Sequence, residues 1–197
     1  YFIQELSREH DITLLSMARP SFQEAHRDAL APHTQHIEVF IAGERGKSSV
    51  QKALHTARTL GSENGSIGAM RAAIERLHVT APFDVVLFSG KPTYAAIRQL
   101  RLPPIVADFT DAASMRIRGQ LEHASPLKMP ALWVKYRQMR ELEQQIVARA
   151  DHLLFASVRD REAILTAANK ASSVMPNGVD VDFWRRESRA LGRHAIA

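Results

Sequence analysis

The chain has 197 residues, enough for one domain with a sizeable core, and 45% of them are hydrophobic and 24% charged, as in an ordinary globular protein. It contains no cysteine, which excludes disulfide bonds and thiolate chemistry, and no apolar run approaches the about 18 residues that cross a bilayer. The net charge is +5, which favours an anionic partner. No signal peptide precedes the first predicted element, and the lack of cysteine fits a reducing cytoplasm, where the protein is expected.

Helices and strands are predicted to alternate along the first half of the chain. Residues 1–8 are typical of the end of a helix, and Pro20 opens a second short helix that Pro32 closes. Further along, the pattern predicts strands over 11–17 and 37–42 and helices over 48–60 and 69–77. Between these two helices, residues 61–68 are predicted to form a Gly-rich loop or a break between helices.

The second half continues the alternation. Residues 83–89 and 104–109 are apolar on both faces, which is the pattern of buried parallel strands. The other predicted elements are helices over 91–101, 112–122, 130–150 and 159–168 and strands over 152–156 and 173–175. This order predicts an α/β fold with a Rossmann-like, doubly wound parallel sheet over residues 1–184. Residues 185–197 are a basic tail or the start of an interdomain linker.

The helix over residues 130–150 combines apolar spacing with positive charge. Its apolar side chains recur every three to four residues, which favours a face packed in the core. They are Trp133, Tyr136, Met139, Leu142 and Ile146. Between Ala112 and Arg140 the only acid is Glu122, against six basic residues. This charge leaves open a peripheral contact with an anionic inner membrane, whereas no nucleic-acid-binding motif accompanies it.

The most specific pattern lies near the end of the sequence. Its parts, in chain order, are Glu143, Ala150-Asp151, a strand that ends before Ser157, a helix, and Pro176-Asn177-Gly178-Val179-Asp180. Asn177 and Gly178 adopt positive φ at low cost, so we expect a sharp turn there. The turn would place backbone amides and the Asp180 carboxylate at the binding edge of the sheet, although a purely structural turn is the alternative.

This series resembles the segment that closes the N-terminal domain of glycosyltransferase family 4 and other retaining GT-B enzymes. Glu5-Leu6-Ser7 and the strand after it are similar to that family's first helix and second strand. The stretch from Pro104 to Arg118 resembles bacterial sugar transferases of exopolysaccharide assembly. The resemblance implies a nucleotide-sugar donor, a glycan or lipid-linked acceptor, and no metal or cofactor.

Two parts of that family pattern have no counterpart in this sequence. One is the first strand with its Gly-rich loop, and the other is the C-terminal domain that holds the donor. The resemblance therefore implies that the chain is an acceptor-side domain that does not transfer sugar by itself. An open sheet edge left by the first strand would favour self-association.

Candidate site residues follow the ends of the predicted strands. Asp111 is the candidate catalytic carboxylate, which could accept a hydrogen bond or a proton from an acceptor hydroxyl. The alternative for Asp111 is to cap the following helix, and the alternative for Gly90 is a plain turn. The candidates for substrate binding are Ser89, Gly90, Thr110, Arg116, Ser157, Asn177, Gly178 and Asp180.

Other classes of function receive less support. Residues 43–48 resemble the end of a phosphate-binding P-loop, but Ile41 stands where that motif needs a glycine or another small residue. His33 and His36 have no further candidate ligand beside them, so no metal site is expected. A non-catalytic module that binds a glycan or an anionic lipid remains the alternative to an enzyme.

Overall fold

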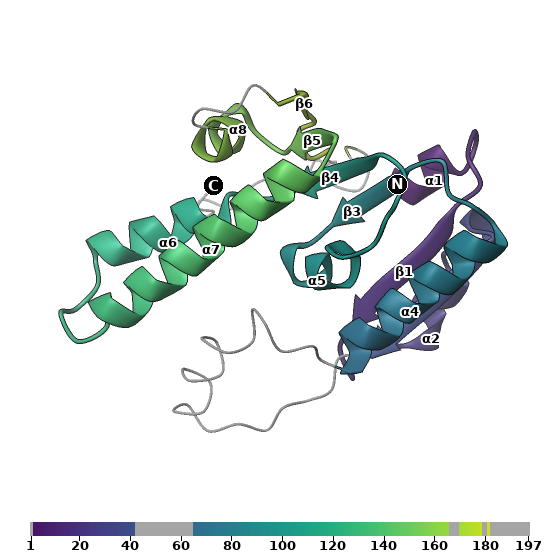
Figure 1. Ribbon diagram of the computed structural model, residues 1–197, viewed down its shortest axis with the longest axis horizontal. Helices are drawn as coiled ribbons and strands as arrows, with labels where there is room; N and C mark the ends of the chain where they lie inside the picture. The colour runs from purple at the N-terminus through teal and green to yellow at the C-terminus, as the bar shows by residue number, and fades with distance from the viewer. Residues whose placement is uncertain (1, 42–64, 166–169, 179–180, 182–197) are drawn as a thin grey trace, which may run out of the picture.

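The computed structural model describes residues 2–41, 65–165, 170–178 and 181. Within these ranges the chain forms parallel β-sheets with helices between successive strands (Figure 1). The predicted α/β, Rossmann-like class is therefore confirmed. The predicted helix over 48–60, the P-loop-like stretch over 43–48, Asp180 and the basic tail lie outside the described residues.

The strands pair in two groups. β1 (Thr13–Ala18) pairs with β2 (His36–Ile41), and the larger sheet has the order β3-β4-β5-β6. The strands of the larger sheet are β3 (Val86–Ser89), β4 (Ile105–Phe109), β5 (His152–Phe155) and β6 (Ser172–Val174). Every pairing is parallel, so the carboxyl ends of β3 to β6 lie along one edge of their sheet.

Helices connect the strands, as a parallel sheet requires. The helices are α1 (Phe2–Leu6), α2 (Glu24–Asp28), α4 (Gly65–Thr80), α5 (Tyr94–Ile97), α6 (Ala113–Glu122), α7 (Met129–Arg149) and α8 (Val158–Ile164), with short 3-10 helices η1 (Ala31–His33) and η2 (Lys91–Thr93). In Figure 1, α6 and α7 pack together as a hairpin that extends away from the sheet.

Two local predictions differ from the structure. Gly65 to Gly68 belong to α4 and not to a loop, because Ile67 and Met70 on its first turns are buried in the core. Ser66 also donates its hydroxyl to the Ile41 carbonyl at 2.8 Å. Pro32 does not simply end a helix but lies inside the 3-10 turn η1. At residues 65–68, the burial of Ile67 and of the neighbouring Met70 therefore outweighs the low helix propensity of glycine.

The strand β3 is only partly buried, which corrects the prediction of a strand covered on both faces. Phe88 is buried, whereas the Leu87 side chain is 41% exposed and Ser89 is exposed. Among the described strands, β3 has a neighbour on one side alone, β4. Its sequence resembles that of a central strand, but in the described part of the chain it has the position of an edge strand.

Glu38 ties β2 to α4. Its carboxylate accepts hydrogen bonds from His36 at 2.7 Å and from Arg76 of α4. The hydrogen bond from His36, together with the one from Arg76, holds the pKa of Glu38 below its usual value. The tie is therefore present above the ordinary carboxyl pKa and is lost as acidification protonates Glu38.

The core is centred on β4 and β5. Ala107, Leu153 and Phe155 are fully buried, and the rings of Phe109 and Phe155 stack with their centroids 5.3 Å apart. Ile146 of α7 covers this centre. The alternation of buried and half-buried residues along β4 confirms that prediction of a buried strand.

We expect Phe155→Ala to destabilise the fold by about 3–5 kcal/mol, because it removes the whole ring and leaves a cavity beside Phe109. Chemical denaturation would measure the loss. The matched control is Val158→Ala, since Val158 is 50% exposed and its truncation should cost about 0.5 kcal/mol or less. Equal losses for the two variants would contradict this account of the core.

Candidate functional site

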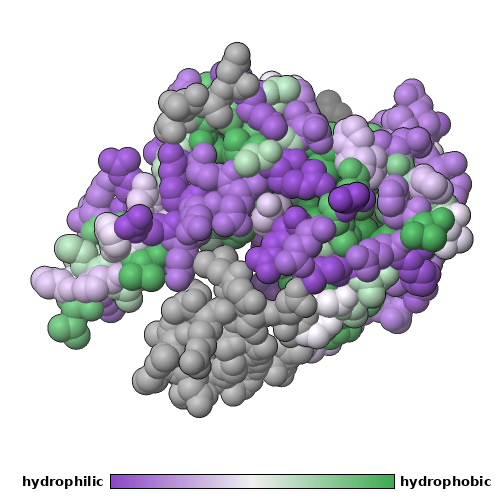
Figure 2. Space-filling model, in the orientation of Figure 1, coloured by the Kyte–Doolittle hydropathy of each residue, from purple (hydrophilic) through white to green (hydrophobic). Residues whose placement is uncertain are grey.

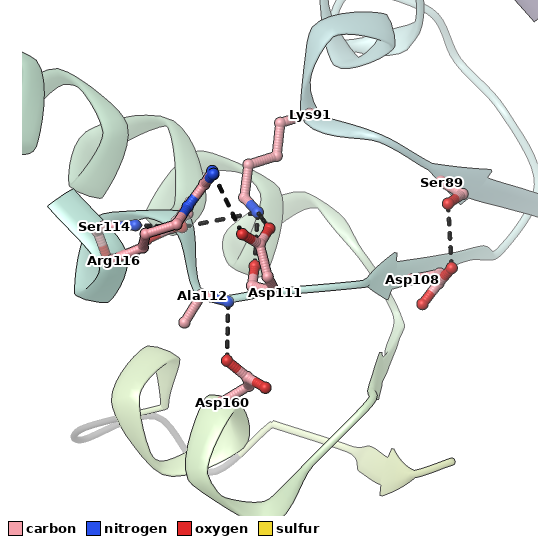
Figure 3. A network of polar contacts seen from close by, with 9 residues as sticks. Ser89, Lys91, Asp108, Asp111, Ala112, Ser114, Arg116 and Asp160 are labelled. Carbon is pink, nitrogen blue, oxygen red and sulfur yellow. Dashed lines mark hydrogen bonds and ion pairs between the residues drawn. The ribbon is translucent and has the colours of Figure 1, made fainter. Parts of the chain in front are cut away.

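Polar side chains gather where β3 and β4 end. Ser89, the last residue of β3, pairs in register with Asp108 of β4. Its hydroxyl donates to Asp108 Oδ2 at 3.0 Å (Figure 3). This contact gives Asp108 a structural role, and it fixes the Ser89 hydroxyl at the edge of the sheet.

Gly90 turns the chain out of β3 into η2. Its φ of 91° is the only positive φ among the described residues, and its ideal Cβ would have 4.0 Å to the nearest side-chain atom, in Thr93. The backbone conformation therefore calls for glycine here, while space does not. The turn directs the following residue, Lys91, back across the ends of the strands.

The Lys91 side chain links three elements. Its ammonium group donates to the main-chain oxygen of Asp111 at 2.6 Å and to Asp111 Oδ1 at 3.1 Å (Figure 3). It lies 3.8 Å from Glu143 Oε1 and 5.5 Å from the centroid of the Phe109 ring. Lys91 is not among the residues predicted from the sequence. The available signal was a basic residue directly after Gly90 at a strand end.

Asp111 lies between two cations. Beyond the contact with Lys91, its Oδ2 is 3.4 Å from an Arg116 nitrogen, and the Asp111 side chain remains 47% exposed. The alternative prediction, that Asp111 caps the following helix, is wrong. Ala112 occupies the N-cap position of α6, and this N-cap residue makes no side-chain hydrogen bond to the helix. Asp111 therefore presents a half-exposed, ion-paired carboxylate.

Carboxylates from two other helices satisfy the start of α6. The amide of Ser114 donates to Glu143 Oε1 of α7 at 3.1 Å, and the amide of Ala112 donates to Asp160 Oδ1 of α8 at 2.9 Å. Negative charge is stabilised at a helix N-terminus. Glu143 is fully buried, and among the described residues its Oε2 has no hydrogen-bond partner.

Tyr94 joins η2 and α5 to α7. Its hydroxyl donates to the Gln145 carbonyl at 3.3 Å, and burial raises the pKa of the phenol above its usual value. The phenol thus stays protonated and able to donate. This contact holds the segment that carries Lys91 against the helix that carries Glu143.

The other predicted residues occupy the same edge at different places. Ser157 caps α8, because its hydroxyl accepts from the Asp160 amide at 3.1 Å and donates to the Asp160 carboxylate. Thr110 is exposed beyond β4. Asn177 and Gly178 are exposed beyond β6, and neither has positive φ, so the expected left-handed turn is not found there.

Distance separates these groups. β6 lies three strands from β3, which is about 14 Å at the usual strand spacing. The structure therefore brings Ser89, Gly90, Asp111 and Arg116 together and leaves Asn177 and Gly178 at the far end of the same edge. It gives no position for Asp180.

A surface depression lies away from the predicted site residues, and neither a cluster of metal ligands nor a membrane-spanning helix was found in the described ranges. A depression of about 300 Å³ is formed by residues of α2 and β2 with Phe22, and no predicted site residue lines it. No group of three candidate metal ligands occurs among the residues whose positions are given. No described helix is long and apolar enough to cross a membrane.

Comparisons with known proteins do not assign the chain to a family. No family model matches the chain, and no curated protein matches it at a significant level. Among solved structures, a chain of sucrose-phosphate synthase from Thermosynechococcus elongatus is similar at 12% identity and a TM-score of 0.43. The match covers 88% of this chain and 93% of that chain. The class defined by the structure itself is a Rossmann-like α/β domain with a polar carboxyl edge.

We expect Glu143→Ala to lower the free energy of unfolding by about 3 kcal/mol, because it uncaps α6 and removes a buried carboxylate from beside Lys91. Urea denaturation would measure it. Glu143→Gln keeps an oxygen for the Ser114 amide and should recover part of the loss.

Glu141→Ala is the matched control, because Glu141 is an exposed glutamate on the same helix. It should change stability by about 0.5 kcal/mol or less. If the Glu143 and Glu141 variants unfold alike, the carboxylate does not hold this edge together.

Proposed function

We propose that this chain is the acceptor-side domain of a retaining glycosyltransferase. The enzyme would move a sugar from a nucleotide-sugar donor to a glycan or lipid-linked acceptor. A second domain, outside this sequence, would hold the donor. The observation that carries the proposal is the half-exposed carboxylate of Asp111, held between Lys91 and Arg116 at the carboxyl end of β4.

The position of this carboxylate supports the proposal. Parallel α/β sheets bind their ligands beyond the carboxyl ends of the strands. Asp111 and Ser89 lie there, and the stretch from Pro176 to Gly178 leaves the same edge after β6. The finer assignment, to family 4 and to bacterial exopolysaccharide assembly in the cytoplasm, depends on the motif resemblances at residues 104–118 and 143–180.

The proposed chemistry assigns a positioning task to this domain. In the transfer, the bond between the anomeric carbon and the donor phosphate breaks, and the acceptor oxygen forms the new bond to that carbon. The acceptor proton passes to the leaving phosphate. Asp111 would accept a hydrogen bond from the acceptor hydroxyl, since a carboxylate has lone pairs left after one cation contacts each oxygen.

Neighbouring groups would bind the rest of the substrates. Arg116 is exposed beside Asp111 and suits a phosphate or carboxylate on either substrate. The turn at Gly90 lets a ligand approach the main chain. Thr110 and Ser89 offer hydroxyl groups nearby, while Ser157, Asn177, Gly178 and Asp180 would bind a more distant part of the ligand, with Ser157 keeping its capping bonds.

The isolated 197-residue chain should show no sugar transfer with any nucleotide-sugar donor, because half of the arrangement that orients donor against acceptor is outside it. A panel of radiolabelled donors incubated with the purified chain would test this. Measurable turnover by the chain alone would overturn the assignment to an acceptor-side domain. Under this proposal, a protein that also contains the donor half should be active.

In that longer product, Asp111→Asn should lower kcat by about a hundredfold. The substitution keeps the size of the side chain and weakens both its acceptor strength and its attraction for Lys91. Asp84→Asn is the matched control, because Asp84 is exposed just before β3, at the opposite edge of the sheet. A full-rate Asp111 variant with an unchanged unfolding transition would refute the role proposed for this carboxylate.

A further inference from the structure

The hairpin of α6 and α7 projects past the carboxyl edge of the larger sheet. Glu143 marks the level of that edge on α7, because its carboxylate contacts Ser114 and Lys91. The helix begins fourteen residues earlier, at Met129, which corresponds to about 21 Å at 1.5 Å per residue. Figure 1 shows both helices running outward from the sheet to a free end.

Large apolar side chains are exposed at this free end. Leu127 is 95% exposed and Trp133 51%, with Met129 and Val134 at 46% and 45%. Trp133 was predicted to face the core, and the structure corrects that prediction because the core contacts of α7 begin farther along the helix, at Leu142. In Figure 2, hydrophobic residues reach the outer end of the hairpin beside hydrophilic ones.

Positive charge surrounds these side chains. Lys128, Lys135 and Arg137 are exposed, and the Arg137 guanidinium lies 5.0 Å from the centroid of the Trp133 ring. No acidic residue occurs from His123 to Arg140. The hairpin tip, meaning residues 127–137, therefore combines apolar groups with uncompensated cations.

This combination matches one kind of partner. Phosphates of anionic lipids attract lysine and arginine side chains near the bilayer surface, and tryptophan is favoured at the boundary between headgroups and hydrocarbon. A nucleic acid would leave Leu127, Met129 and Val134 without apolar partners. A second copy joined by two-fold symmetry would bring the same cations together.

We propose that the hairpin tip docks on a bilayer that contains anionic lipids. Leu127, Met129, Trp133 and Val134 would enter the headgroup region, and Lys128, Lys135 and Arg137 would contact lipid phosphates. The docking does not require sugar transfer, so it can hold whether or not the proposed function is correct.

Vesicle co-sedimentation tests the proposal with the purified chain. We expect binding to vesicles of phosphatidylcholine mixed with phosphatidylglycerol, weakened by high salt, and little binding to phosphatidylcholine alone. In the Trp184→Phe background Trp133 is the one remaining tryptophan of two, and its emission should shift to the blue on binding.

Matched variants locate the contact. Lys128→Gln with Lys135→Gln should lower the partition coefficient about fivefold for each cation. Leu127→Ser should also weaken binding, while Arg159→Gln and Val158→Ser, at exposed positions of α8, should leave it unchanged. Equal binding to both vesicle types, no binding, or equal losses for the α8 variants would overturn the proposal. A tip variant that changes the sedimentation coefficient of the protein but not its binding to vesicles would also overturn the proposal. That result would indicate that the tip contacts a second copy of the chain.

Discussion

The carboxylate of Glu143 is the contact on which the carboxyl edge depends. It extends from α7 to the first turn of α6 and lies beside the ammonium group of Lys91, which follows β3. A buried charge is costly unless it is paired and hydrogen-bonded. One oxygen of Glu143, Oε1, has both of these partners, and Lys91 is thereby held where it also contacts Asp111.

The sequence predicted the regular parts of the fold because their signals are local. The strands β4 and β5 are short apolar runs between turn residues, and α7 has sustained helical spacing. Prediction from the sequence failed where burial depends on residues that are far away along the chain. Leu87 lies on a strand with one described neighbour, and Trp133 lies on a part of α7 that extends beyond the sheet, so the same apolar pattern is exposed in both places.

The candidate site divides in the same way. Ser89, Gly90 and Asp111 could be selected from sequence because each follows a strand, and parallel strands end at a common edge. The partners could not, since Lys91 meets Asp111 across 20 positions and Ala112 meets Asp160 across 48. Such pairs are set by how helices cross the sheet. The capping role of Asp111 was a reasonable local prediction, and distant carboxylates took its place.

The geometry of the hairpin restricts which acceptor could serve both proposals together. If the hairpin stands upright on the membrane, Asp111 lies about 20 Å from the headgroups, near the base of α6. A lipid phosphate with one sugar would not span that distance, whereas a lipid carrying several sugar units would. If the hairpin lies along the surface, the exposed face of α7 would contact lipid over most of its first half, and short acceptors would reach Arg116 and Asp111. The depth of Trp133 and the length of accepted glycans are thus coupled, because α6 begins two residues after Asp111 and ends at Glu122, close to the tip.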